Sequence, residues 1–293
     1  MAPRRARSWW VSVPASRTIL AALAVLAAGC QPHPAAQPAA GVVAADEPPQ
    51  RVVSLDYCAD QFVIGLADRS QIAGVSPDAV RDFSYLRTEA RGLPVVRPAA
   101  EAILTARPDL VVRSYGGGAA ITGQLERLGI RVHQIGWGDD VAAIRSHVRD
   151  AATAIGQVAR GEGLVARLDR QLADAAGAGA GRTLLYVSAA GVTTGAGTGV
   201  GQLITAAGFQ PFETRPGWQP IDLERLAGAA PDHAATVFFD TPTARQNSRS
   251  PAHHPVAQRL LAEVPVTRLD GATTVCAGWF VGDAVTALAE AAR

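Results

Sequence analysis

Two cysteines are the side chains with the most reactive chemistry in the body of this chain. Cys58 and Cys276 are expected in loops that follow strands, one in each half of the sequence. A disulfide between them would need Cα atoms within about 7 Å. If the two halves formed a cleft that held a ligand, the cysteines would not ordinarily come so close. A pair of soft metal ligands is a second interpretation, although their wide separation gives no diagnostic metal spacing. Separate, half-buried cysteines are the third interpretation and the one expected here.

Aromatic side chains form the second group with a chemical use. Planar rings offer rigid apolar area for a flat macrocycle or chelate, although each ring could instead belong to the core. The candidates are Tyr57, Tyr115, Trp218, Trp279 and Phe280. Ser114 and Trp137 are expected on the same rim as Tyr57, Cys58 and Tyr115, because ligands gather beyond the carboxyl ends of parallel strands. Arg97 and Arg113, near that rim, could pair with carboxylates of an anionic ligand.

The remaining patterns speak against catalysis and against a resident metal. His253 and His254 stand at a helix start, where a capping or surface role is expected, and the other histidines are scattered. The glycine-rich loop at 191–201 fails the spacing of nucleotide-binding loops. An enzyme would need Cys58 as a nucleophile beside a histidine, and no catalytic motif places one there. We therefore expect no enzyme, no metal site and no intrinsic cofactor.

A repeat of one short motif links the two halves of the chain. Glutamate, six residues, then Pro-Asp and a β-branched strand occur at 101–109 (EAILTARPD) and again at 224–232 (ERLAGAAPD). Glu101 and Glu224 each fall in the first turns of a helix, where the helix dipole favours an anion, and this alone could explain them. The repeat also indicates that the two halves are related lobes.

The elements that must position these residues are two α/β lobes. Short apolar strands alternate with helices over 51–156 and again over 177–293, which predicts mainly parallel sheets. Between them, apolar residues recur at helical spacing through 157–176, so one long helix is expected to join the lobes. An ordinary surface helix inside one domain is the alternative.

The N-terminus has the pattern of an export signal. Arginines precede an apolar run too short to span a membrane, and residues 1–30 end in LAAGC, which resembles a lipoprotein box with Cys30 as the lipidated residue. Plain cleavage without lipidation is the alternative. Residues 31–50 are rich in Pro and Ala and are interpreted as a tether. The expected location is the periplasm or the cell surface.

The charge balance bears on partners. All 27 basic residues are arginine, four of them precede Cys30, and 26 residues are acidic, so a mature chain would carry a slightly negative net charge. Such a body argues against a nucleic-acid partner.

The order of these features resembles a known family. RVVSL at 51–55, QLERLGIRV at 124–132, the paired Glu-x6-Pro-Asp motifs, the joining helix and a C-terminal aromatic loop are similar to the cobalamin, siderophore and heme binding proteins of ABC importers. The resemblance covers 51–293 and implies class III architecture, with two Rossmann-like lobes joined by one long rigid helix. It also implies that Glu101 and Glu224 dock on arginines of the permease.

The resemblance assigns further roles. It places the loops of Tyr57, Tyr115, Trp218 and Cys276 to Trp279 at the ligand. We expect a monomeric, lipid-anchored substrate-binding protein that delivers a metal chelate to a permease and its ATPase, with cobalamin or another corrinoid first and iron-siderophore or heme as the alternative. A periplasmic sensor or scaffold without transport is a further alternative. A single joining helix predicts that the cleft opens by small twists.

Overall fold

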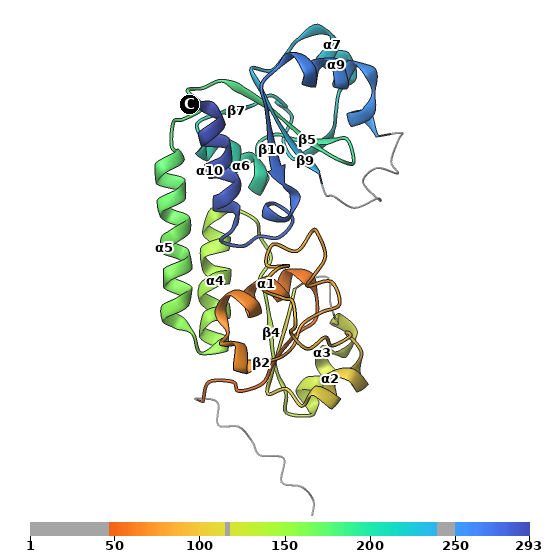
Figure 1. The fold of residues 1–293 in the computed structure, drawn as a ribbon, viewed down its shortest axis with the longest axis vertical. Coiled ribbons are helices and arrows are strands. Elements are labelled where there is room, and N and C mark those ends of the chain that lie inside the picture. Colours follow the sequence, from red (N-terminus) through yellow and green to blue (C-terminus); the bar gives the residue numbers. More distant parts are fainter. Residues whose placement is uncertain (1–46, 115–117, 239–249) are drawn as a thin grey trace, which may run out of the picture. The chain divides into compact units, whose positions relative to one another are not determined.

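The computed structural model describes residues 47–114, 118–238 and 250–293, all within one compact unit (Figure 1). Two of the expected functional residues, Cys30 and Tyr115, lie outside these ranges. Within them, two parallel sheets are each flanked by helices, which confirms the expected α/β class. No described helix is both long and apolar enough to cross a membrane.

The first lobe is built on a parallel sheet in the order β2-β1-β3-β4. Its two central strands are fully buried because helices cover the sheet, as parallel sheets require. The strands are β1 (Val52–Ser54), β2 (Ile72–Gly74), β3 (Leu110–Arg113) and β4 (Arg131–Gln134). The helices are α1 (Tyr57–Leu66), α2 (Ala100–Ala106), α3 (Thr122–Arg127) and α4 (Val141–Ile155), with short 3-10 turns η1 (Arg69–Gln71) and η2 (Ala119–Ile121).

The second lobe repeats this plan, with a parallel sheet in the order β10-β9-β5-β7 and a small antiparallel pair, β6-β8. The strands are β5 (Thr183–Ser188), β6 (Val192–Thr194), β7 (Gln210–Pro211), β8 (Trp218–Pro220), β9 (His233–Phe238) and β10 (Val266–Asp270). The helices are α6 (Gly199–Ala206), α7 (Leu223–Gly228), α9 (Pro255–Glu263) and α10 (Val281–Ala292), with turns η3 (Pro251–His253) and η4 (Gly271–Thr273).

The aspartates of the repeated motif have the same structural role in both lobes. Asp109, just before β3, accepts hydrogen bonds from the backbone N–H groups of Gln50 (2.7 Å) and Arg51 (3.0 Å), where the chain enters β1. Asp232, just before β9, accepts from the backbone N–H of Thr183 (2.7 Å), the first residue of β5. Each carboxylate therefore fixes the start of its lobe's first strand against a neighbouring strand, so the motif repeat is also a repeat of structure.

The expected joining helix is present as α5 (Val158–Ala175). It lies along α4 and α10 in Figure 1, and its buried face contains Val165 and Leu168. Glycine is unfavourable inside a helix, but close packing explains Gly161. A Cβ at this position would lie 2.4 Å from the Cβ of Ala152 on α4. The absence of a side chain lets the two helices approach closely.

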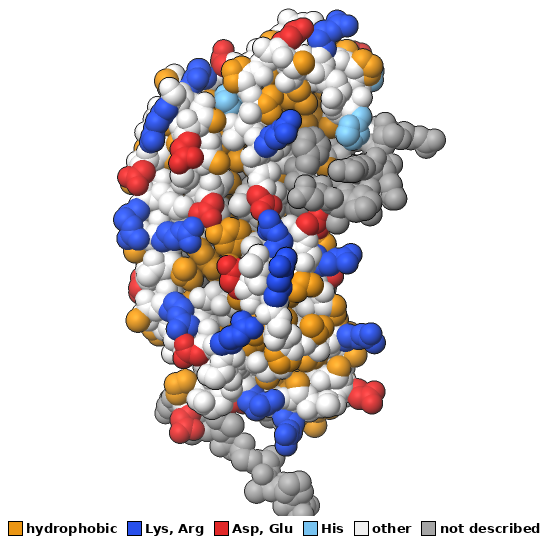
Figure 2. Space-filling model, in the orientation of Figure 1, with side chains coloured by type: hydrophobic (Ala, Val, Ile, Leu, Met, Phe, Trp, Pro, Cys, Tyr) orange, Lys and Arg blue, Asp and Glu red, His pale blue; other side chains and the backbone are white. Residues whose placement is uncertain are grey.

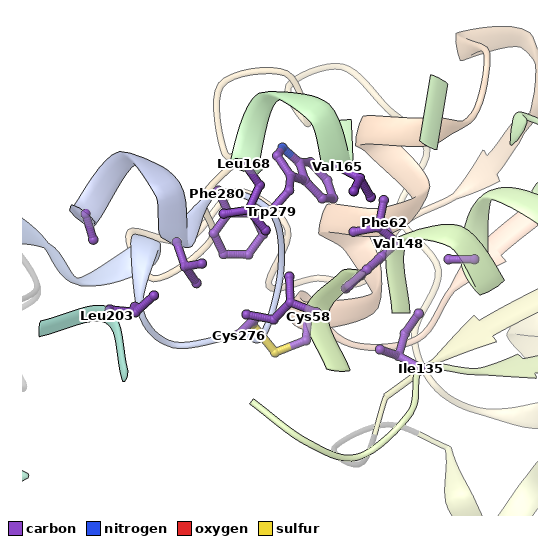
Figure 3. Packing of buried hydrophobic residues seen from close by; sticks show 14 of the residues in the cluster. Cys58, Phe62, Ile135, Val148, Val165, Leu168, Leu203, Cys276, Trp279 and Phe280 are labelled. Atoms are coloured by element: carbon purple, nitrogen blue, oxygen red, sulfur yellow. A yellow bond between two sulfur atoms is a disulfide. The ribbon is translucent and has the colours of Figure 1, made fainter. Parts of the chain in front are cut away.

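One hydrophobic cluster runs through both lobes. It contains Phe62 of α1, Leu168 of α5 and Phe280 beside α10, together with core residues of both sheets (Figure 3). The lobes therefore share buried apolar surface, which opposes wide separation because exposing it to water is unfavourable.

On the face shown in Figure 2, arginine side chains are scattered with acidic side chains between them.

Candidate functional site

A pocket of about 350 Å³ is lined by both lobes. Its wall is mainly apolar, with a few polar groups, which is the usual composition of a small-molecule site. The first lobe and α4 contribute Cys58, Phe62, Ser114, Ile135, Gly136, Trp137, Gly138, Asp139 and His147, and the second lobe contributes Gly199, Val200, Leu203, Trp218, Thr274, Val275, Cys276, Ala277 and Val281.

The expectation of separate cysteines was wrong. Cys58 and Cys276 form a disulfide with a Cα–Cα distance of 5.5 Å (Figure 3). Both residues line the pocket. Cys58 is brought there because α1 begins earlier than expected: Asp56 caps the helix by accepting the N–H of Ala59 (2.9 Å), so Cys58 lies in the first turn and not in a loop. The bond joins the two lobes at the pocket wall.

Trp279 does not line the pocket, contrary to its expected role in ligand binding. Its side chain is only 3% exposed and packs edge-on against Phe62 of α1, with ring centroids 5.8 Å apart. Phe280 is also buried and stacks on Tyr85 at 4.5 Å. The aromatic C-terminal loop is thus part of the core between the lobes, because large planar rings bury more apolar area there than at a pocket rim.

Ser114 lines the pocket, whereas Tyr57 does not. Tyr57 is half-buried and packs edge-on against Phe83 at 4.9 Å, and it is not part of the pocket wall. Ser114 lines the wall, and its hydroxyl donates to Asp56 Oδ1 (2.6 Å) while its backbone N–H donates to Oδ2 (2.7 Å). Asp56 therefore connects the end of β3 to the start of α1, and Ser114 serves first as a structural part of the wall.

Two tryptophans face the pocket from opposite lobes. Trp137, between Gly136 and Gly138, is 86% exposed, and Trp218 at the start of β8 is 48% exposed. Gly138 has φ +123°, a conformation that L side chains rarely adopt, so the loop after β4 depends on glycine to present Trp137. Exposed rings on the wall of an apolar pocket are suited to contact with a flat ligand.

The two arginines proposed for an anionic ligand are not part of this wall. Arg113 is buried, and its guanidinium donates to Thr122 (3.3 Å) and Gln134 (3.1 Å). Arg97 is exposed. His254 acts as expected, because its side chain caps α9 at the N–H of Val256 (3.3 Å). Among the described residues, no group of three or more His, Cys, Asp or Glu could hold a metal ion.

Sequence reasoning missed several pocket residues on the loop after β4 and on the two helices beside it. Gly136, Asp139 and His147 line the wall, and Asp139 Oδ2 accepts the backbone N–H of Gly199 at the start of α6 (2.9 Å). That bond joins the lobes across the pocket. The sequence shows a glycine-rich loop that opens a helix at Gly199. It does not show that Asp139 binds there, because the two residues are 60 positions apart.

The two repeated glutamates are both exposed. Glu101 lies in the first turn of α2 and Glu224 in the first turn of α7. Neither carboxylate makes an ion pair with a residue in the described ranges. Each lobe therefore carries one accessible carboxylate at an equivalent place in its fold.

Comparison with known proteins identifies the family. The model of the family described as "Periplasmic binding protein" matches residues 52–253. The chain belongs to the periplasmic binding protein family. It is a periplasmic substrate-binding protein of the ABC-importer type, and such proteins are solute carriers.

Solved structures agree with this identification. A periplasmic heme binding protein from Pseudomonas aeruginosa is 26% identical to this binding protein, with a TM-score of 0.64 over 83% of this chain and 92% of that one. The heme-binding protein BhuT in complex with two hemes (23% identity, TM-score 0.63, 83% and 99% covered) and the siderophore binding protein BauB (18%, 0.65, 85% and 94%) share the fold. Among curated proteins, none matches the chain.

Proposed function

We propose that this binding protein captures heme or a ferric chelate in the pocket between its lobes and delivers it to an ABC permease. The observation that carries the proposal is the apolar pocket with exposed Trp137 and Trp218 on its wall, one from each lobe. Two indole rings in that position are suited to the faces of a flat ligand. The heme binding protein from Pseudomonas aeruginosa, at 26% identity, supports heme as the first ligand to test.

A corrinoid, which the sequence analysis placed first, is less favoured than heme. A pocket of about 350 Å³ lies near the lower end of the range of roughly 300–1,000 Å³ for small-molecule sites. Heme is flat, whereas cobalamin carries substituents on both faces of its ring. A compact pocket with the lobes joined by a disulfide favours the flatter molecule.

Tryptophan fluorescence tests the proposal directly. The chain has five tryptophans, two of which precede Cys30, so the mature body contains Trp137, Trp218 and Trp279. We expect submicromolar to micromolar heme to quench the two pocket tryptophans, with ferric siderophores and cobalamin as competing titrants. Trp137→Phe and Trp218→Phe should each remove part of the quenching.

The matched control is Trp279→Phe, because Trp279 is buried outside the pocket wall. This substitution should lower the starting fluorescence and leave the ligand affinity unchanged. If heme, ferric siderophores and cobalamin all fail to bind at micromolar concentration, the proposed function is wrong. If a ligand binds but deletion of this protein leaves the uptake of that ligand unchanged, the sensor or scaffold role replaces delivery.

Docking and anchoring belong to the same proposal. We infer that Glu101 and Glu224 meet arginines of the permease, because each is exposed in the first turn of a helix of its lobe. Glu101→Arg with Glu224→Arg should abolish uptake and leave ligand affinity intact.

Lipidation at Cys30 is tested separately by metabolic labelling with a fatty acid, using Cys30→Ala as the control.

A further inference from the structure

The pocket wall contains one histidine whose hydrogen-bonding capacity is unfilled. His147 of α4 is only 5% exposed, and its Nδ1 is buried without a hydrogen-bond partner among the described residues. Leaving a buried polar nitrogen unpaired destabilises a fold, so such a group needs a reason. No sequence pattern singles out His147, which is one of several scattered histidines.

The other ring nitrogen of His147 lies beside Gly136. A Cβ built at Gly136 would be 2.7 Å from Nε2 and 2.8 Å from Cδ2 of His147, and both residues line the pocket. Gly136 has no positive φ, so its backbone does not demand glycine. The missing side chain instead lets the backbone of Gly136 pack against the ring edge at Nε2, and both residues form part of the pocket wall.

The environment of the ring favours one tautomer. A neutral imidazole carries its proton on one nitrogen only. A proton on Nδ1 would bury an N–H donor without an acceptor, which proteins avoid most strongly. A proton on Nε2 leaves only an unpaired acceptor in the interior and directs the donor towards the pocket.

Neighbouring polar side chains on the wall are already engaged within the protein. The Ser114 hydroxyl donates to Asp56, Asp139 accepts from Gly199, and the Thr274 hydroxyl donates to the backbone carbonyl of Gly271 (3.3 Å). His147 lacks such a partner in the part of the chain that the structure describes. A pocket that is otherwise apolar usually orients its ligand through a few such polar groups.

We propose that His147 is the ligand-orienting residue of the pocket and donates a hydrogen bond from Nε2 to a carboxylate oxygen of the bound ligand. The inference rests on the proposed function and adds the chemical class of the ligand, an anionic chelate with a free carboxylate. A carboxylate accepts a stronger hydrogen bond than a neutral oxygen, and low exposure strengthens the bond further.

Heme and its dimethyl ester are the probes, because they share the ring and differ in their carboxylates. His147→Phe keeps a ring of similar size in the buried site and removes the donor. We expect it to weaken heme binding about ten- to a hundredfold, the effect of losing a hydrogen bond to a charged group. Binding of the ester should be weaker than that of heme in the wild type and nearly equal to it in His147→Phe.

Two further variants separate loss of the donor from a folding defect. Gly136→Ala keeps the imidazole in the chain but places a methyl group within 2.7 Å of the present position of Nε2, so the ring must shift, and heme binding should weaken as in His147→Phe. His147→Gln, whose amide N–H can replace the donor, should restore most of the affinity.

The failures of the two proposals are distinguishable. If the wild type binds neither heme nor a ferric chelate, the proposed function fails. If the wild type binds heme and the preference for heme over its ester persists in His147→Phe and Gly136→Ala, the donor assignment is overturned. A change of the heme absorption spectrum to that of a different iron ligand in His147→Phe would also overturn it, since Nε2 would then bind iron.

Discussion

At the scale of single residues, Asp60 has a carboxyl group whose pKa is strongly shifted by burial. Asp60 lies on α1 and is fully buried, and its carboxylate accepts hydrogen bonds from the Ser54 hydroxyl, the Ser76 backbone N–H (2.9 Å) and the Ser76 hydroxyl (2.6 Å). Burial raises its pKa to about 6, against an ordinary value of 3.8, although the hydrogen bonds act in the opposite direction. The group joins β1 to the segment after β2 and has no place in the pocket.

Asp60 predicts a pH dependence of stability. The folded state holds its proton up to about pH 6 and the unfolded state releases it near pH 4, so the folded state binds more protons in this window. The free energy of unfolding should therefore fall as the pH rises from 4 to 6.5. At about 1.4 kcal/mol per pKa unit, Asp60 would account for roughly 3 kcal/mol.

Urea unfolding at pH 4, 5, 6 and 7 would measure this contribution. Asp60→Asn removes the titration, so the difference between wild type and variant should shrink or reverse as the pH rises. The other carboxyl groups are common to both proteins and cancel in the comparison. Parallel stability curves for the two proteins would contradict the assignment.

The tryptophans provide a second prediction at this scale. Trp279→Ala should lower the free energy of unfolding by about 3–5 kcal/mol, because it removes a buried ring from the core between the lobes. Trp218→Ala should change stability by less than about 1 kcal/mol and weaken ligand binding, because its ring is half exposed on the pocket wall. Chemical denaturation and a heme titration of both variants test this, and a reversed pattern would restore Trp279 to the ligand site.

At the scale of elements, the contact between α4 and α5 depends on Gly161. A Cβ there would lie 2.4 Å from that of Ala152, whereas a Cβ at Gly163 meets nothing within 4 Å. Gly163→Ala should stabilise the protein by up to about 1 kcal/mol through helix propensity. Gly161→Ala has the same propensity gain but should destabilise, since the helices must move apart. Thermal unfolding of this matched pair measures the difference, and equal shifts would show that the helices do not pack closely.

The elements were largely predictable from the sequence, and their partners were not. Helical spacing predicted the helix at 157–176, and the β-branched runs predicted the parallel strands, because local periodicity reports which face is buried. Expectations at the pocket were less accurate. An aromatic residue in a late loop suits a ligand or a core equally well, and only the packing of Trp279 on Phe62 decides between them. Cys58 and Cys276 meet only through the tertiary fold, so their spacing carried no signal.

At the scale of the whole described unit, the lobes are held by more than the joining helix. Asp283 of α10 accepts hydrogen bonds from Tyr85 of the first lobe (2.5 Å) and from Arg167 and Gln171 of α5 (2.6 Å each). Burial alone would raise the pKa of Asp283, but these donors hold it below its usual value. An ion pair between Arg87 and Asp270 (2.9 Å) and the disulfide add further links. These contacts, together with the helix, predict that the cleft opens only by small twists.

The disulfide gives the sharpest prediction about motion. It closes a loop of 218 residues, for which the chain-entropy model gives a stabilisation of about 5 kcal/mol, and measured effects are commonly about 2–5 kcal/mol. Cys58→Ala with Cys276→Ala should lose stability in that range. Because α5 and the disulfide restrain the lobes at separate places, removing the bond should also free rotation about the helix. Solution scattering should then show little change of the wild-type radius of gyration with heme, and a larger change for the double variant.

Hydrogen exchange would locate the released motion. In the double variant, we expect faster exchange in α1 near Cys58 and in residues 274–280, with α4 and α5 as internal controls, because their contact does not involve the disulfide. Titration of free thiols in the unreduced wild type should find no reactive pair at Cys58 and Cys276. A large compaction of the wild type on ligand binding would contradict the restraint, because a covalent bond at the pocket wall prevents the lobes from starting far apart.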